Sequence, residues 1–277
     1  MEYLNTAFNF NSDELIEVLD ELPFWSAPFG IKLLDKIKFR KNITILDIGF
    51  GTGFPLLELA MRFGQTCKII GIDPWKAAIK RVNKKIKFYE IKNIKIIEGK
   101  AENIPLGNNS VDLIVSNNGL NNVKNLDRAL SECSRIIKTK GKFVQAFNLN
   151  ITMFEFYEIF EKLLNELKMK NEIQKMKAHI YKKRKPLDEL INKIEKNGFA
   201  INEIEHDIFE YKFNDGTSMM NHYFIKLAFL NEWKNILPKE KQSQILKELE
   251  KRMNKKAESD GLFKLSIPFV VIDAEKD

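Results

Sequence analysis

The sequence predicts an α/β fold, in which helices cover both faces of a doubly wound, mostly parallel sheet. Apolar, β-branched segments lie near residues 43–48, 68–72, 94–97, 111–115 and 142–147, and stretches with helical spacing separate them. Such alternation is typical of parallel sheets. A glycine-rich turn follows the first segment, and Asp73 ends the second. The alternation predicts the fold class, and the turn predicts where a ligand lies.

The residues before the first strand have the character of helices. Ser12 can cap a helix whose first turn carries Asp13 and Glu14, which are favourable beside the positive end of the helix dipole. Pro23 ends this helix, an aromatic loop covers residues 24–30, and a second helix is expected over 31–37. We therefore expect residues 1–40 to form an N-terminal helical lid.

The turn Gly49–Gly53 indicates a ligand that lies against the main chain, because glycine has no Cβ to block a close approach. Asp73 stands at about the spacing at which an acidic residue binds ribose hydroxyls, so the ligand is expected to carry an adenosine. A dinucleotide turn, G-x-G-x-x-G, needs a third glycine where this chain has Phe54. The turn thus disfavours a pyrophosphate ligand.

Four landmarks in order resemble the class I S-adenosylmethionine (SAM) dependent methyltransferase family. They are the D-x-G-x-G-x-G turn that begins at Asp47, the segment 100–102 after the third strand, the fourth strand and its loop over 111–118, and the helix-to-strand turn over 134–143. The resemblance covers roughly residues 43–147 and implies a SAM-binding core over 41–147. It also implies a Rossmann-like sheet of seven strands whose last strand is antiparallel.

The resemblance implies roles for particular residues. Asp47 is expected to reach the amino group of SAM, and Asp73 is expected to hold the ribose hydroxyls. S-adenosylhomocysteine would be the product. The full set of expected cofactor-binding residues is Asp47, Gly49, Phe50, Gly51, Gly53, Asp73, Pro74, Trp75, Lys100, Ala101, Glu102, Ser116, Asn117 and Asn118.

After residue 147 the pattern becomes mainly helical. Thr152 and Glu155 have the spacing of a capping box before a long amphipathic helix, and a shorter helix is expected over 187–197. The basic run 182–185 is interpreted as a solvated linker. We expect residues 148–277 to hold cap helices over the carboxyl ends of the strands, together with the closing strands at about 199–213 and 263–273.

The loop after the fourth strand also excludes some substrates. Methyltransferases that modify exocyclic amino groups of nucleic acids share a proline-containing motif at this position, which Ser116 to Gly119 lacks. The two cysteines, Cys67 and Cys133, are expected to be buried free thiols, too few for a metal cluster or for arsenite. No metal is expected. Trp25, Tyr157 and His222 are candidate substrate contacts, and no catalytic base is assigned.

These observations favour a methyltransferase that acts on a small, apolar or aromatic molecule by in-line displacement. A net charge of +7 keeps an RNA methyltransferase open as an alternative, although nucleic acid is not the favoured partner, and a SAM-binding protein without turnover is a second alternative. No apolar run approaches the ~20 residues that cross a bilayer, and no secretory signal is evident. We expect a cytoplasmic monomer or homodimer.

Overall fold

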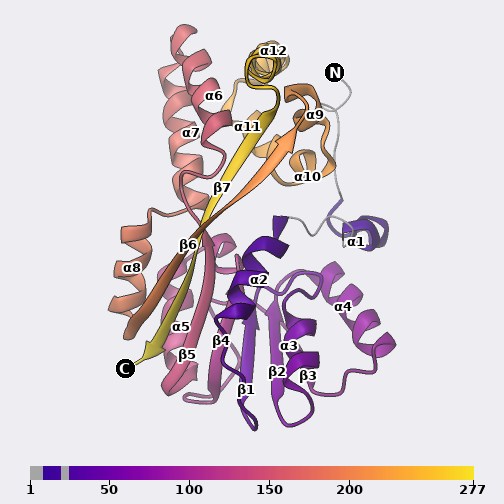
Figure 1. The fold of residues 1–277 in the computed structure, drawn as a ribbon, viewed down its shortest axis with the longest axis vertical. Coiled ribbons are helices and arrows are strands. Elements are labelled where there is room, and N and C mark those ends of the chain that lie inside the picture. Colours follow the sequence, from indigo (N-terminus) through magenta and orange to yellow (C-terminus); the bar gives the residue numbers. More distant parts are fainter. Residues whose placement is uncertain (1–8, 20–24) are drawn as a thin grey trace. The chain divides into compact units, whose positions relative to one another are not determined.

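A computed structural model describes residues 9–19 and 25–277, and Figure 1 shows their helices and strands. The chain divides into two compact units. Of the described residues, the sheet unit comprises 9–19, 25–148, 185–207 and 269–277, and the helical unit comprises 149–184 and 208–268. Parts of the predicted lid, including Pro23 and Phe24, lie outside the described residues.

The sheet has seven strands in the order β3-β2-β1-β4-β5-β7-β6. Pairing is parallel from β3 to β5, and β7 runs antiparallel to β5. This confirms the predicted fold class with its antiparallel last strand. The strands are β1 (Thr44–Ile48), β2 (Lys68–Asp73), β3 (Ile94–Glu98), β4 (Val111–Asn117), β5 (Ile137–Asn148), β6 (Phe199–Phe213) and β7 (Phe263–Lys276).

Helices of the sheet unit follow the strands as the sequence predicts. Helix α3 packs beside β2 and α4 beside β3 (Figure 1), while α5 packs against α8. The helices are α1 (Asp13–Leu19), α2 (Ala27–Asp35), α3 (Leu56–Phe63), α4 (Lys76–Phe88), η3 (Leu120–Asn122), α5 (Leu126–Ile136) and α8 (Leu187–Lys196). The predicted cap at Ser12 is confirmed, since its Oγ accepts a hydrogen bond from the Leu15 amide at 3.1 Å.

Two boundaries in this unit differ from the prediction. Helix α2 begins at Ala27, inside the expected aromatic loop, because Pro28 lies in its first turn, where the missing N–H carries no cost. Strand β5 begins at Ile137, five residues before the expected start at 142. Ile137 pairs with Val111 of β4 before the register shifts, and Lys140 there adopts a φ of 61°. The turn that the sequence indicates is therefore an irregularity within β5.

The helical unit contains α6 (Phe154–Glu166), α7 (Lys170–Lys183), α9 (Gly216–Asn221), α10 (Tyr223–Ile225), η4 (Lys226–Leu230), α11 (Asn231–Ile236), η5 (Lys239–Lys241) and α12 (Gln242–Asp260). Aromatic rings form its core. The Trp233 ring is completely buried and stacks on Phe156 with ring centroids 4.0 Å apart. Phe229 stacks on the same indole at 5.7 Å. The mainly helical character predicted after residue 147 is confirmed.

The predicted capping box at the start of α6 is wrong. Thr152 Oγ donates to the Leu149 carbonyl, and the buried Glu155 carboxylate accepts hydrogen bonds from the amide and hydroxyl of Ser266. Met153, in a left-handed conformation with φ 60°, precedes the helix instead. Glu155 is therefore used to fasten α6 to β7 rather than to cap its own helix.

The basic run 182–185 is not a solvated linker. Lys182 and Lys183 end helix α7, which the sequence analysis does not predict, and Lys183 pairs with Glu232 at 2.7 Å. Arg184 is only 6% exposed and lies over the Phe229 ring. Residues 182–184 therefore belong to the packed interior and edge of the helical unit, and Lys185 begins a segment of the sheet unit.

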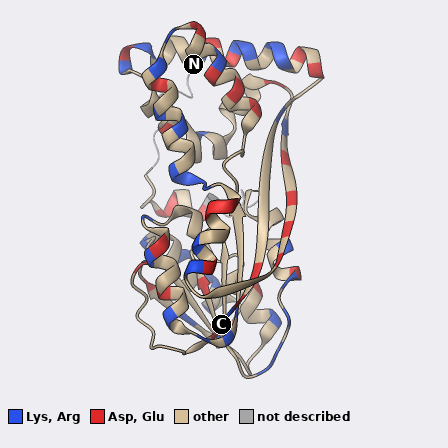
Figure 2. Ribbon diagram, turned by 90° about the vertical axis from the view of Figure 1, so that its left-hand side faces the viewer, with Lys and Arg blue, Asp and Glu red and all other residues tan. Residues whose placement is uncertain are grey.

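Charged residues of both signs are interleaved. Figure 2 shows Lys and Arg alternating with Glu and Asp along α12, where Arg252 pairs with Glu248 at 2.9 Å. Opposite charges also meet in the sheet unit, where Lys36 of α2 reaches Glu203 and Glu205 of β6. None of the described helices is both long and apolar enough to cross a membrane.

Candidate cofactor and acceptor site

The glycine turn joins β1 to α3 at the carboxyl edge of the sheet. Gly49 has a φ of 77°, and a Cβ there would lie 2.6 Å from the Cα of Gly119. Gly51, with φ 51°, has open space where a Cβ would project. Glycine is thus required at position 49 by a close backbone approach to the loop after β4, whereas at position 51 it is required by backbone conformation.

Asp73 braces this turn from the end of β2. One carboxylate oxygen accepts a hydrogen bond from the Gly51 amide at 2.9 Å, and the other accepts one from the Trp75 amide at 2.8 Å. Burial raises the pKa of Asp73, and these two amide hydrogen bonds partly offset the rise. Since a carboxylate has about four acceptor positions, Asp73 can also accept from ribose hydroxyls.

Asp47 is a completely buried carboxylate at the end of β1, and neither of its oxygens has a hydrogen-bond partner. Burial, and then the charge of Asp73, raise the pKa of Asp47 well above its ordinary value. The Leu56 amide faces the carboxylate and lowers the pKa somewhat, without reaching full hydrogen-bond geometry. A buried carboxylate without a partner is unfavourable, so this group fits the positively charged amino group of SAM.

The expected adenine-side residues have varied surroundings. The Trp75 indole N–H donates to the Phe10 carbonyl at 2.7 Å, and its ring lies 5.9 Å from that of Phe10. Glu102 accepts hydrogen bonds from the backbone amides of Lys124 and Asn125, which holds the start of α5. Phe50 and Ala101 are buried, and Pro74 and Lys100 are exposed. Their contacts with SAM stay predictions.

The loop after β4 lies against β1 and α2. Ser116 Oγ donates to the Ile48 carbonyl at 2.8 Å and accepts from the Leu120 amide at 3.1 Å, so its hydroxyl is already used to fix the loop. Asn117 Nδ2 donates to the Ser26 carbonyl at 2.9 Å. Asn118 adopts a φ of 61°, which asparagine tolerates better than most residues. This loop is thereby held beside the glycine turn.

The three candidate substrate contacts fall in different units. Trp25 is half-buried in the sheet unit, next to Ser26, with its ring edge-on to Phe29 at 6.0 Å. Tyr157, in the helical unit, is 6% exposed, and its hydroxyl accepts from the Trp233 indole at 3.1 Å. His222 lies edge-on to the rings of Tyr211 and Phe213, and burial lowers its pKa.

Two polar residues at this edge of the sheet escaped the sequence analysis. Asn148 ends β5 and is 3% exposed, and Asn121 lies in η3. Asn121 Nδ2 donates to the Asn148 carbonyl at 3.1 Å. Their signal in the sequence is weak, since the rule that ligands bind at the carboxyl ends of parallel strands points to Asn148 only once the end of β5 is known.

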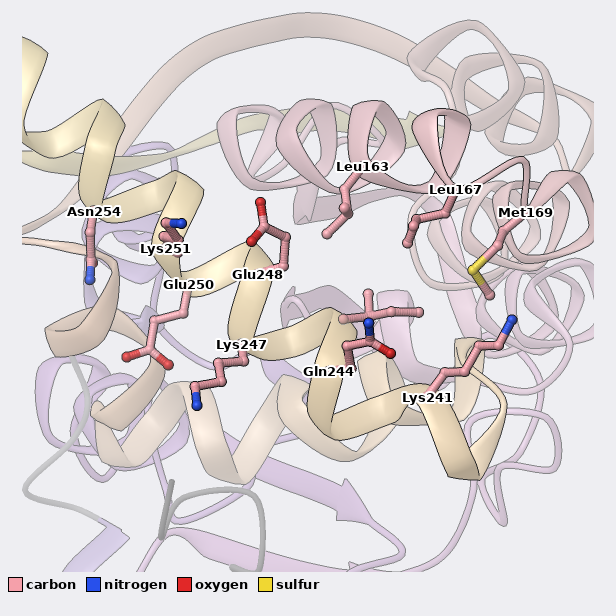
Figure 3. Close-up of a pocket in the computed structure, with 11 residues that line it drawn as sticks. Leu163, Leu167, Met169, Lys241, Gln244, Lys247, Glu248, Glu250, Lys251 and Asn254 are labelled. Atoms are coloured by element: carbon pink, nitrogen blue, oxygen red, sulfur yellow. The ribbon is translucent and has the colours of Figure 1, made fainter.

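A cavity of about 800 Å³ lies in the helical unit. Figure 3 shows Leu163, Leu167 and Met169 pointing from the α6 side toward α12, with Lys241 at one end. None of the predicted site residues lines this cavity. Among the described residues, no group of three or more His, Cys, Asp or Glu side chains is placed to hold a metal ion. The two cysteines are buried and free, as predicted.

Comparison with known proteins agrees with this geometry. Residues 46–145 match the family described as "Methyltransferase domain". This match and the sheet order agree with a class I SAM-dependent methyltransferase domain over residues 46–145.

Among curated relatives, demethylmenaquinone methyltransferase from Geobacillus sp. (strain WCH70) is 28% identical over 127 residues, which cover 46% of this chain and 54% of the relative. The enzyme of the same name from Oceanobacillus iheyensis is 33% identical over 111 residues, covering 40% and 47%. The chain thus spans about half the length of the curated relatives it matches.

Solved structures share the fold over most of the chain. YcgJ from Bacillus subtilis is 16% identical, with a TM-score of 0.61, and the match covers 90% of this chain and 98% of that one. Geranyl diphosphate C-methyltransferase from Streptomyces coelicolor A3(2) is 16% identical, with a TM-score of 0.56, over 100% of this chain and 88% of that one. At these identities the likeness concerns the fold alone.

Proposed function

We propose that this chain is an enzyme that transfers the methyl group of SAM to a small, apolar or aromatic molecule by direct in-line displacement. The observation that carries the proposal is the buried carboxylate of Asp47, which has no partner within the protein and lies in the first strand before the glycine turn. A cationic ligand would supply the missing partner. We also propose that the protein is located in the cytoplasm and that it is a monomer or a homodimer.

We propose that residues of the sheet unit bind SAM and orient its methyl group. SAM, when bound, supplies a methyl group on a positively charged sulfur, which an electron-rich atom can attack. Asp47 would hold the amino group, Asp73 the ribose hydroxyls, and the Gly49–Gly53 backbone would pass close to the ligand. Orientation of this kind can supply several kcal/mol of the barrier reduction. No side chain is assigned as a general base.

Two lines of support favour a small acceptor. The curated relatives are named for demethylmenaquinone and one structural neighbour for geranyl diphosphate, which are both small molecules. The helical unit has an aromatic interior, and there His222 lies edge-on to the stacked rings of Tyr211 and Phe213. We propose that Trp25, Tyr157 and His222 contribute to acceptor selection.

The experiment is a thermal-shift titration of wild type and Asp73→Ala with SAM, S-adenosylhomocysteine and NADH. A ligand that binds only the folded state stabilises it by about 2.7 kcal/mol at one hundred times its dissociation constant. We expect both SAM compounds to stabilise wild type and to lose most of that effect in Asp73→Ala. The matched control is Asp127→Ala, because Asp127 is an exposed acid on α5 paired only with Lys193 among the contacts described.

Stabilisation by NADH alone would contradict the proposal.

Turnover is tested separately by incubation with SAM and a metabolite extract, in which we expect S-adenosylhomocysteine and a methylated small molecule. Methyl transfer only to RNA, with binding that weakens steeply as salt rises, would favour the RNA alternative. SAM binding without any transfer would favour the non-catalytic alternative.

A further inference from the structure

Four asparagines lie where β4 and β5 end. Asn117 and Asn148 are the last residues of these neighbouring strands, which pair in parallel with Asn117 opposite Ala146. Asn118 and Asn121 lie in the loop after β4. Asn118 Oδ1 accepts from the Asn148 backbone amide at 3.1 Å, and Asn121 Nδ2 donates to the Asn148 backbone carbonyl at 3.1 Å. These bonds link Asn118, Asn121 and Asn148, and together with the adjacent Asn117 we call these residues the asparagine cluster.

The hydrogen bonds determine which end of three of these side-chain amides remains free. Because the Asn118 oxygen must accept from an N–H, its free end is the Nδ2 donor. Because the nitrogens of Asn117 and Asn121 must donate to carbonyls, their free ends are Oδ1 acceptors. The usual ambiguity between amide nitrogen and oxygen is thereby resolved for these three residues, and the Asn148 amide can turn either end toward a ligand.

These free ends are buried and unpaired. Asn117 Oδ1, Asn118 Nδ2, Asn121 Oδ1 and Asn148 Nδ2 all lack a hydrogen-bond partner. Buried polar groups are almost always paired with protein or ordered water, and each exception calls for an explanation. Several such atoms at one place, at the edge where α/β sheets bind ligands, indicate a polar group that is supplied by a ligand.

The cluster lies beside the expected cofactor. Gly119 directly follows Asn118, and its Cα is the atom that a Cβ on Gly49 would meet at 2.6 Å. On its other side, Asn117 is hydrogen-bonded to Ser26, the residue after Trp25. The loop that carries Asn117 and Asn118 therefore contacts both the glycine turn and the segment that follows the proposed substrate contact Trp25.

The cluster combines donors and acceptors and carries no charge. An ammonium or carboxylate group would need an opposite charge when buried, whereas a hydroxyl group both donates and accepts. Resting on the proposed function, we infer that Asn118, Asn121 and Asn148 form a carboxamide subsite that holds an enolic or phenolic hydroxyl of the methyl acceptor. Asn121 Oδ1 accepts from the hydroxyl, and the Nδ2 groups of Asn118 and Asn148 donate to its oxygen.

The test replaces single donors without disturbing the bonds that shape the cluster. Asn118→Asp keeps the oxygen that accepts from Asn148 and changes the free end from a donor to an acceptor. Asn148→Asp changes the second donor in the same way and keeps both backbone bonds of residue 148. Asn125→Asp is the matched control, because Asn125 Oδ1 caps α5 by accepting from Arg128, which an aspartate does equally well.

The measurement is calorimetric titration of 1-naphthol and of 1-naphthoate into each protein with saturating S-adenosylhomocysteine. We expect wild type and Asn125→Asp to bind 1-naphthol in preference to 1-naphthoate. Asn148→Asp should bind 1-naphthol about tenfold more weakly, the effect of one lost hydrogen bond, with unchanged affinity for S-adenosylhomocysteine. Asn118→Asp, at an expected cofactor contact, should weaken the binding of both compounds. Retained thermal unfolding temperatures would show that the variants fold.

Three results would overturn the inference: no binding of 1-naphthol to wild type, equal binding by wild type and both cluster variants, or a preference for 1-naphthoate. Each of these is read with S-adenosylhomocysteine bound, so the proposed function survives them. Failure of wild type to bind S-adenosylhomocysteine at all would instead overturn the proposed function, together with the inference that depends on it.

Discussion

The sheet unit and the helical unit differ in what surrounds their unpaired polar atoms. At the carboxyl edge of the sheet, carboxylate and amide atoms are unpaired, as with Asp47 and Asn118. In the helical unit, unpaired Arg184 Nη1 and His222 Nδ1 belong to side chains that lie against aromatic rings. The first environment is polar, whereas the second combines polar atoms with aromatic surface.

Polar side chains of the helical unit also form hydrogen bonds with one another. Glu155 is bonded to Ser266, and Glu250 accepts from the Thr217 hydroxyl at 2.7 Å. The comparison supports the proposal that the cofactor binds to the sheet unit, whereas the helical unit has an aromatic interior. Three experiments can break or sharpen this division.

The largest effect is expected from Trp233→Ala. This indole is completely buried between Phe156 and Phe229, and such truncations cost about 3–5 kcal/mol. We expect a large fall in the free energy of unfolding of the helical unit, measured by urea denaturation, with unchanged affinity for S-adenosylhomocysteine. Trp233→Phe keeps the stacking and loses the bond to Tyr157, so it should cost only about 1 kcal/mol. Loss of cofactor affinity in folded Trp233→Ala would break the proposed division.

A middle effect is expected from two matched glycine substitutions in the sheet unit. Gly49→Ala and Gly51→Ala both place a Cβ on a residue with positive φ, which costs about 1–2 kcal/mol. At position 49 the Cβ also meets Gly119, whereas at position 51 it meets nothing within 4 Å. We expect Gly49→Ala to lower the free energy of unfolding by about 1–3 kcal/mol more than Gly51→Ala. Equal losses would show that the loop after β4 can move away.

The same division explains how much could be predicted from the sequence. The glycine turn and the alternation of strands and helices were predictable because each depends on a pattern within a short segment, and the antiparallel last strand was implied by the family resemblance. The roles of Thr152 and Glu155 were not, because Glu155 finds its partner in Ser266, 111 positions away. The burial of Arg184 escaped prediction for a similar reason, since its aromatic neighbour comes from η4.

The asparagine cluster could be predicted from the sequence only in part. The sequence places Asn117 and Asn118 after a strand, and it predicts that they line a ligand site. It does not reveal which amide ends are free, because that depends on partners such as Ser26 and Asn148. Local patterns therefore locate a site at the strand ends, and tertiary hydrogen bonds determine what it can recognise.

The smallest effect concerns Asp47→Asn in the absence of ligand. Burial raises the pKa of Asp47 in the folded protein above the ordinary value of about 3.9. Between those two values the folded state keeps a proton that the unfolded chain has lost. The contribution of Asp47 to the free energy of unfolding therefore falls as pH rises above about 4, until the folded pKa is reached.

Asparagine does not titrate, so Asp47→Asn should escape this fall. Relative to wild type, we expect its free energy of unfolding to increase between acidic and neutral pH. The measurement is urea denaturation at about pH 4 and about pH 7, with Asp127→Asn as an exposed control. Because the amide cannot pair with a cation, the variant should be more stable when empty and weaker in binding SAM. A variant that gained stability yet bound SAM as tightly as wild type would mean that Asp47 has no cationic partner in the ligand.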